Sequence, residues 1–185
     1  MSSSFTSLVQ TAEANPAAAD FAALRAAYLT SEAYRPAKHI MQSKLMQITN
    51  AAPGFEQVSE TCRRILSANP MDLEARRLYG LAQEELGNAA AAEQAYAFAE
   101  AMIDAILQTG DGKSIEGAWH VVAEAEIWTL FKIFGMRPSG QTRQAVGERI
   151  YDIFDGQIDD RPVTMYFDVT PFVRHIDQLI SDETG

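Results

Sequence analysis

The sequence has little cysteine, no long apolar run and no cluster of basic residues, and each shortage excludes something. Cys62 is the only cysteine among 185 residues, so the chain cannot form an internal disulfide, and a single thiol is typical of a reducing compartment. No run approaches the roughly 20 apolar residues of a membrane-spanning helix, and the N-terminus lacks the basic and apolar regions of a signal peptide. We therefore expect a soluble, cytoplasmic protein that does not bind membranes.

Positive charge is also scarce. The 15 lysines and arginines are outnumbered by 25 acids, which gives a net charge of −10. A chain of this charge repels nucleic acid phosphates and anionic lipid heads, so neither is an expected partner. The length and the hydrophobic fraction of 47% are sufficient for one domain with a single core. Within that domain we expect a loosely attached segment at 1–19, helical hairpins at 20–135, and a β element with a final helix at 136–185.

Helical periodicity dominates the first two thirds of the chain. Asp20 is a natural N-cap, and Asn-Pro and Pro-Gly pairs end several of the periodic segments. The predicted helices cover residues 4–14, 21–29, 37–49, 55–68, 71–87 and 89–107.

One segment resembles a tetratricopeptide repeat. Residues 70–104 match one period of about 34 residues, with the alternation of small and large side chains that lets paired helices approach closely. Gly80 and Tyr96 belong to this pattern. Any antiparallel hairpin with alanine-rich contacts would look similar, and both interpretations predict stacked helical hairpins.

A helix at residues 114–134 is predicted to lie at the centre of the fold. We expect Ser114 to be its N-cap and Gly135 its C-terminal stop. Apolar side chains on two sides indicate that other elements cover it on both. Glu126 projects into the apolar stripe, where an ionised carboxylate must be paired. Either a structural partner such as Arg25 pairs with Glu126, or Glu126 is a functional acid in a cleft.

After this helix the pattern changes to short aromatic and β-branched segments. Residues 149–155 and 163–169 are predicted to form antiparallel strands joined by a loop at 156–162, and residues 142–146 can add a third strand. A final helix is expected from Pro171 to about Ile180. Of Tyr166 and Phe167, the one that faces inward should contact the central helix. The predicted fold is mainly α, with stacked helical hairpins, a small antiparallel hairpin or three-stranded meander, and a final helix.

Several short motifs occur in an order that resembles a known family. They are Ser31-x-x-Tyr34-x-Pro36, Gly-Asp-Gly-Lys-Ser at 110–114, Glu126 in the next helix, and Tyr-Phe-Asp at 166–168. Together they resemble a bacterial family catalogued only as a domain of unknown function, over residues 21–179. Where that family tends to carry two adjacent acids and a tyrosine, this chain has Glu-Ala-Glu-Ile-Trp at 124–128. The resemblance implies a helical domain with a small β element and assigns no activity.

The Gly-Asp-Gly-Lys-Ser segment copies the end of a phosphate-binding P-loop. The full motif requires glycine at the position of Leu107 and a strand leading in, whereas a helix is predicted there. Nucleotide binding is therefore disfavoured and no cofactor is predicted. The alternative is a turn between two helices, although a helix N-terminus beside charged groups also suits an anion.

Three polar residues share one face of the predicted central helix. Glu116, His120 and Glu124 recur every four residues, so a histidine and a glutamate could supply two metal ligands. A site needs three or four, and none lies nearby in the sequence, so no metal is predicted. A solvated helix face or a ladder of ion pairs is the favoured explanation of the spacing.

We expect a non-enzymatic protein interaction module, in which helical hairpins present a surface to a protein or peptide. An adaptor, chaperone or immunity protein with a basic partner would fit the negative charge. The alternative is a small-molecule or anion-binding domain or a hydrolase. A pocket gathering the polar residues would favour that alternative, whereas an open groove lined by aromatic residues would favour a protein partner. The alternative site would use Asp111, Lys113, Ser114, His120, Glu124 and Glu126, with no catalytic role assigned to any of them.

Overall fold

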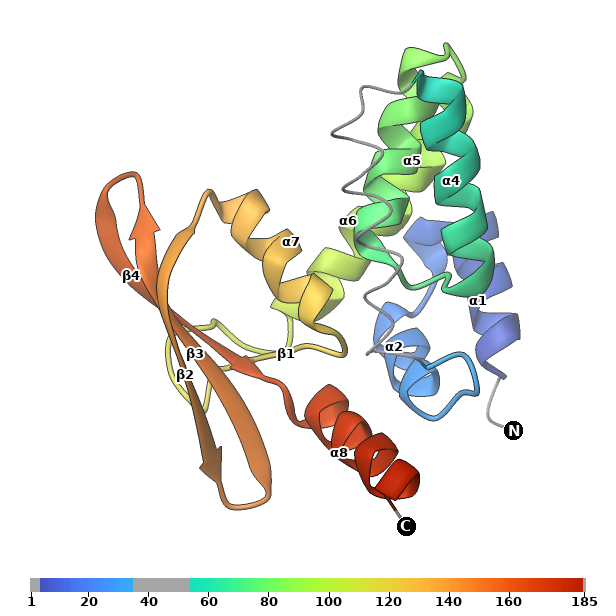
Figure 1. Cartoon of the computed structure of the whole chain (residues 1–185). Helices are drawn as coiled ribbons and strands as arrows, with labels where there is room; N and C mark the ends of the chain where they lie inside the picture. Colours follow the sequence, from blue (N-terminus) through green and yellow to red (C-terminus); the bar gives the residue numbers. More distant parts are fainter. Residues whose placement is uncertain (1–3, 35–53, 185) are drawn as a thin grey trace. The chain divides into compact units, whose positions relative to one another are not determined.

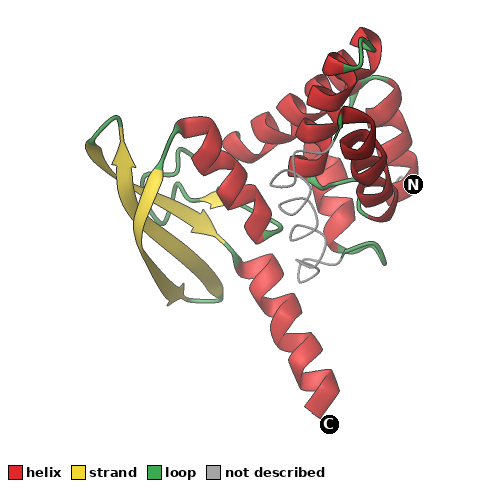
Figure 2. Ribbon diagram, turned by 45° about the horizontal axis from the view of Figure 1, so that its top comes forward, coloured by secondary structure: helices red, strands yellow, loops and turns green. Residues whose placement is uncertain are grey.

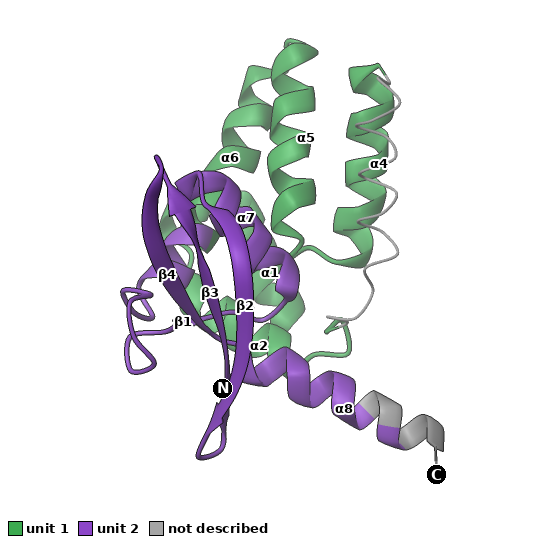
Figure 3. Cartoon of the chain, turned by 60° about the vertical axis from the view of Figure 1, so that its left-hand side comes forward, with its two compact units in different colours: residues 1–102 green, residues 103–185 purple. Residues whose placement is uncertain are grey.

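The chain forms two compact units, residues 1–102 and residues 103–185 (Figure 3). This computed structural model describes residues 4–34 and 54–184. The helix predicted at 37–49, together with His39, lies outside the described residues. We predicted one domain, in which the helical hairpins end at residue 135 and a β element follows. This division into units does not test that prediction.

The first unit is helical (Figure 1). It contains α1 (Phe5–Ala14), the short η1 (Pro16–Ala18), α2 (Phe21–Leu29), α4 (Phe55–Ala68), α5 (Leu73–Glu85) and most of α6 (Ala89–Leu107). Ser4, Asp20 and Asp72 cap α1, α2 and α5, because each side chain accepts a hydrogen bond from a backbone N–H in the first turn of its helix. The predictions for these helices, including the Asp20 cap, are confirmed.

Close helix contacts explain the alternation of small and large residues in the first unit. Cys62 and Ile65 of α4 form a buried cluster with Ala75 and Ala82 of α5. A Cβ atom added to Gly80 would lie 2.6 Å from the Tyr96 ring, so glycine is what allows the tyrosine to pack there. The tetratricopeptide-like stacking itself stays a prediction.

The second unit is a four-stranded sheet with two helices (Figure 2). Its elements are β1 (Trp119–His120), α7 (Glu124–Phe134), β2 (Arg137–Val146), β3 (Arg149–Ile158), β4 (Arg161–Asp168) and α8 (Thr170–Thr184). The strand order is β1-β4-β3-β2. Strands β2, β3 and β4 form the predicted antiparallel meander, and the final helix is also confirmed. The prediction of a purely antiparallel sheet was wrong, because β1 pairs with β4 in parallel.

The predicted central helix is half as long as expected. Helix α7 begins at Glu124, and Ser114 is not its N-cap. Residues 114–123 form turns and the short strand β1, so Glu116, His120 and Glu124 do not share a helix face. The helix is shorter for two reasons: Gly112 has a left-handed φ of 68°, and Trp119 pairs with Phe167 of the distant strand β4. Gly135 is confirmed as the stop, with a left-handed φ of 68°.

Strands β3 and β4 are longer than predicted because their connection is short. The loop expected at 156–162 shrinks to Asp159 and Asp160, which have φ values of 48° and 62°. Two successive left-handed residues match the right-handed twist of the flanking strands. Aspartate tolerates this conformation better than most residues, so the acidic loop is suited to a tight turn.

An aromatic cluster joins α7 to the sheet. Phe167 is 0% exposed, and its ring lies 5.7 Å from Phe131 of α7 and 5.9 Å from Phe154 of β3. The prediction that the inward-facing residue of the Tyr-Phe-Asp motif contacts this helix is confirmed, with Phe167 in that position. Trp119 also lies against Phe167, so β1 belongs to the same core.

Candidate functional site

The Gly-Asp-Gly-Lys-Ser segment is part of a closed turn between α6 and β1. The Gly117 carbonyl accepts hydrogen bonds from the backbone N–H groups of Asp111 and Gly112, at 3.0 and 2.8 Å. The Asp111 carboxylate accepts from the N–H of Lys113, and the Ser114 hydroxyl accepts from the N–H of Gly117. The backbone N–H groups of Asp111, Gly112 and Lys113 are therefore engaged within the turn itself and are not available to a phosphate.

Two glycines, Gly110 and Gly112, let this turn close so tightly. A Cβ atom on Gly110 would lie 2.1 Å from the Gly117 carbonyl oxygen, and one on Gly112 would lie 2.6 Å from the Trp119 ring. The Trp119 indole N–H donates to the Gly110 carbonyl, and the Gly112 carbonyl accepts from Tyr166 of β4. The pattern that resembled a P-loop thus serves to fasten the turn to the sheet.

The two glutamates of α7 have different surroundings. Glu126 is 3% exposed, as its position in the apolar stripe predicted, and its Oε2 accepts a hydrogen bond of 2.8 Å from the backbone N–H of Val122. It lies in the first turn of α7, where a carboxylate satisfies a backbone donor and interacts favourably with the helix dipole. Glu124 is exposed and accepts from the Trp128 indole at 3.4 Å. Pairing of Glu126 with Arg25 stays a prediction.

His120 has neighbours that the local sequence does not reveal. It ends β1 in register with Asp168, the last residue of β4, and its Nε2 lies 3.3 Å from Nη1 of Arg149. Asp168 belongs to the Tyr-Phe-Asp motif, which was the one available signal, whereas nothing in the sequence indicated Arg149. Asp111, Lys113 and Ser114 thus share the turn, Glu126 lies in the first turn of α7, and His120 lies beside Asp168 and Arg149. Within the described residues, no three His, Cys, Asp or Glu side chains are placed to hold a metal ion.

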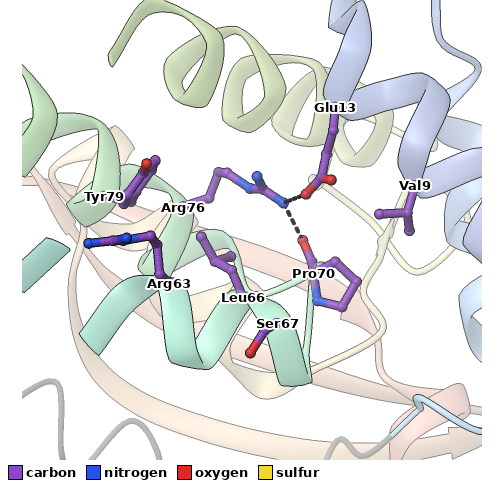
Figure 4. A pocket seen from close by; sticks show the side chains of 8 residues that line it. All are labelled: Val9, Glu13, Arg63, Leu66, Ser67, Pro70, Arg76 and Tyr79. Carbon is purple, nitrogen blue, oxygen red and sulfur yellow. Dashed lines mark hydrogen bonds and ion pairs between the residues drawn. The ribbon is translucent and has the colours of Figure 1, made fainter. Parts of the chain in front are cut away.

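The helical unit contains a pocket that the sequence did not predict (Figure 4). It has a volume of about 410 Å³ and receives side chains from three helices. Val9 and Glu13 come from α1, Arg63, Leu66 and Ser67 from α4, and Arg76 and Tyr79 from α5, with Pro70 in the α4–α5 connection.

Arg76 is the most constrained side chain of this pocket. Its Nη2 donates to the Glu13 carboxylate at 3.1 Å and to the Pro70 carbonyl at 3.0 Å, as the dashed lines in Figure 4 show. The guanidinium carbon also lies 4.0 Å from the centre of the Phe98 ring, within the range of a cation–π interaction.

Burial dominates the electrostatics of Arg76. The side chain is only 9% exposed, and Nε is buried without a hydrogen bond to any residue that the structure describes. Desolvation lowers the pKa of Arg76, and the hydrogen bond to Glu13 opposes this effect. Arg63, in contrast, is exposed at the pocket edge. The pocket therefore combines a fixed, buried cation with an accessible one and with apolar side chains.

None of the described helices is both long enough and apolar enough to cross a membrane. No curated protein and no solved structure matches the chain. A family model described as a domain of unknown function matches residues 5–178, which extends the resemblance noted in the sequence to almost the whole chain. That match covers both units, including the closed turn, His120, Asp168 and the residues that line the helical pocket. The protein therefore belongs to the family called Domain of unknown function (DUF4919).

Proposed function

We propose that this protein is a non-enzymatic interaction module whose helical unit binds a segment of another protein. The observation that carries the proposal is the pocket between α1, α4 and α5, with its mixed apolar and charged lining. Grooves between helices commonly receive a side chain of a bound peptide, while polar groups at the edge bind its main chain.

The lining indicates what part of a partner would fit. Val9, Leu66 and Pro70 offer an apolar surface for one aliphatic or aromatic side chain of the partner. Arg63 and Tyr79 supply hydrogen-bond donors for carbonyl oxygens next to that side chain. The bonds of Arg76 to Glu13 and Pro70 hold one wall in place before binding, which reduces the entropy lost on association.

Net charge favours a basic partner. With a net charge of −10, the chain attracts positively charged proteins before they touch it. This long-range attraction raises the association rate at low salt. An adaptor, chaperone or immunity protein with a basic client in the cytoplasm agrees with this charge and with the single, buried cysteine. The alternative of a small-molecule or anion site at the Gly-Asp-Gly-Lys-Ser turn has less support, because the backbone N–H groups of Asp111, Gly112 and Lys113 are engaged within the turn.

Adjacent arginines on α4 provide a matched test. Arg63 lines the pocket, whereas Arg64 is exposed on the same helix and pairs with Glu60. A photocrosslinking amino acid at Ser67 should form a discrete adduct in cells of the source organism, and the partner can then be identified and purified. Arg63→Ala and Arg64→Ala each remove one positive charge, so they change long-range attraction equally.

For the purified partner we expect Arg63→Ala to weaken binding at least about tenfold, which corresponds to roughly 1.4 kcal/mol, and Arg64→Ala to change it less than about twofold. Affinity should also fall as salt is added. Equal effects of the two substitutions would contradict binding at the pocket. So would a photocrosslinking amino acid placed at Arg64 that forms as much adduct as the one at Ser67.

A further inference from the structure

A buried aspartate lies at the edge where β1 and β4 end. Asp168 is 5% exposed, and its Oδ1 accepts hydrogen bonds from both the backbone N–H and the hydroxyl of Thr170, at 3.0 and 2.5 Å. Its Oδ2 accepts from Nη1 of Arg149 at 3.1 Å. The carboxylate is thus held in one orientation, and one cation compensates its charge.

Arg149 is anchored through a single nitrogen. Nη1 lies 3.1 Å from Asp168 and 3.3 Å from Nε2 of His120, whereas Nε and Nη2 make no hydrogen bond with any residue in the described part of the chain. The side chain is 56% exposed. A guanidinium with two free neighbouring nitrogens presents the parallel donors that bind a carboxylate or phosphate through two oxygens.

His120 stands beside this guanidinium at a position fixed by the backbone. Its N–H donates to the Thr109 hydroxyl at 2.8 Å, and the next residue, Val121, donates to the Asp168 carbonyl at 3.1 Å. The imidazole is 48% exposed, and its Nε2 lies 3.9 Å from Asp168 Oδ2. Neutral His120 can accept from Arg149, and protonated His120 places a second positive charge at the same point.

The other two arginines of the meander that form ion pairs differ from Arg149. Arg143 uses both Nε and Nη2 to bind Asp152, so the donors of its fork are occupied. Arg137 pairs with Asp160, but both of these side chains are largely exposed, so the pair lacks the buried anchor that Asp168 gives to Arg149. Of these three arginines, Arg149 is the one that has a buried carboxylate as its anchor, two nitrogens without a partner in the described part of the chain, and an adjacent imidazole.

We propose that Arg149 and His120 form a binding site for an oxyanion group, the carboxylate or phosphate of a small molecule. Arg149 binds two oxygens of the ligand through Nε and Nη2, and an imidazole N–H of His120 donates to the same group. Asp168 is a positioning residue that orients the guanidinium. The site lies entirely within residues 103–185 and does not rest on the proposed protein-binding function.

The test is an NMR titration with two simple probes, inorganic phosphate and acetate, at fixed pH and with sodium chloride at equal ionic strength as the reference. The imidazole signal of His120 should move and saturate with a Kd below about 10 mM for at least one probe. Saturation by phosphate alone identifies a phosphate site, saturation by acetate alone a carboxylate site, and saturation by both a general oxyanion site. Shifts no larger than those with chloride would overturn the proposal.

Matched variants separate a specific site from general attraction. Arg149→Lys keeps the charge next to Asp168 but removes the paired donors, so it should weaken binding at least tenfold. Arg137→Lys makes the same change at an exposed ion pair and should alter binding less than twofold. Equal effects would overturn the proposal.

A second variant covers the case in which Arg149→Lys unfolds. His120→Gln changes a half-exposed side chain, and the titration can then be followed at the Nε–H signal of Arg149. That signal should still saturate, at higher probe concentration than in the unmodified protein. If the Arg149 signal responds to neither probe, in the unmodified protein or in His120→Gln, the proposed binding through Nε and Nη2 is ruled out.

Discussion

Arg143 binds the buried carboxylate of Asp152 through two parallel hydrogen bonds, Nε to Oδ1 and Nη2 to Oδ2, each 2.7 Å long. The two residues face each other across β2 and β3, and Gln141 adds a third donor to the same carboxylate at 3.0 Å. This hydrogen bonding raises the pKa of Arg143. Since every residue of β2 is exposed, the pair is a principal side-chain attachment of that strand to the sheet.

Arg143→Ala should therefore destabilise the protein substantially. The Asp152 side chain is 2% exposed, so the substitution leaves a buried charge whose remaining side-chain partner, among the residues that the structure describes, is the neutral amide of Gln141. Because Arg143 is itself half-exposed, we expect a loss of about 2–4 kcal/mol, toward the lower part of the range for broken buried pairs. Arg137→Ala, which breaks an exposed pair with Asp160, should cost less than about 1 kcal/mol. Urea unfolding measures both, and equal losses would contradict the assignment.

Gly80→Ala should have opposite effects in two backgrounds. Alanine has a higher helix propensity than glycine by about 1 kcal/mol, but its Cβ would lie 2.6 Å from the Tyr96 ring. Overpacking of this kind costs about 1–3 kcal/mol, so the single substitution should be destabilising. In a Tyr96→Ala background the clash is gone, and Gly80→Ala should stabilise the protein. A double-mutant cycle in urea tests this, and the same sign in both backgrounds would mean that the two residues do not conflict.

Glu126 and Glu124 should respond differently to truncation. Glu126→Ala leaves the buried N–H of Val122 without its acceptor, so we expect a loss of about 1–3 kcal/mol. Glu126→Gln keeps an acceptor oxygen and should cost less. Glu124→Ala affects an exposed side chain and should change stability by less than about 0.5 kcal/mol. Thermal unfolding of the three variants tests these expectations. Similar small shifts of the melting temperature in all three would argue against a structural role for Glu126.

The thiol of Cys62 should be unreactive in the folded protein. The residue is 0% exposed, and burial, with smaller contributions from Asp72 and Glu74, raises its pKa from 9.0 to about 12. Alkylation by iodoacetamide at neutral pH should proceed only through unfolding, whereas the same chain in denaturing urea should react quickly. Rapid labelling of the native protein would show that α4 and α5 separate readily.

The same pKa shift predicts alkaline destabilisation. Above pH 9.0 the unfolded chain releases the thiol proton while folded Cys62 retains it until about pH 12. The folded state then holds more protons, so the free energy of unfolding falls as the pH rises through this window and is unaffected below it. Cys62→Ala should have a flatter stability profile between pH 9 and 11. The test compares how steeply the free energy of unfolding changes with pH in the two proteins. Its absolute value is not compared, because alanine also leaves a cavity.

Residues with a local cause for their structure could be predicted from the sequence. Asp20 caps α2 because its carboxylate reaches the next free N–H groups, and Gly135 ends α7 because the left-handed conformation favours glycine. Alternation predicted that either Tyr166 or Phe167 contacts the central helix, and the structure identifies Phe167 as that residue. By contrast, Trp119, Val121 and Val122 fit both helical and strand periods, and the choice depends on pairing with β4, which the local pattern does not contain.

The candidate sites depend on residues that only the folded chain brings together. His120, Arg149 and Asp168 come from three strands, so no spacing in the sequence joins them. Glu13 and Arg76 are likewise far apart in the chain, yet they share a wall of the helical pocket. A sequence pattern detects contacts within one helix or one hairpin, and both sites are built from contacts between elements.

The parallel pairing of β1 with β4 sets an order for folding during synthesis. Trp119 and His120 leave the ribosome before Phe167 and Asp168, their partners in register, have been made. Until then β1 has no neighbouring strand in this sheet, since β3 and β2 pair only with β4 and with each other. The sheet can therefore be completed only after residues 161–168 have emerged, and a ribosome that stalls before residue 161 holds a nascent chain whose Trp119 still lacks its strand partner.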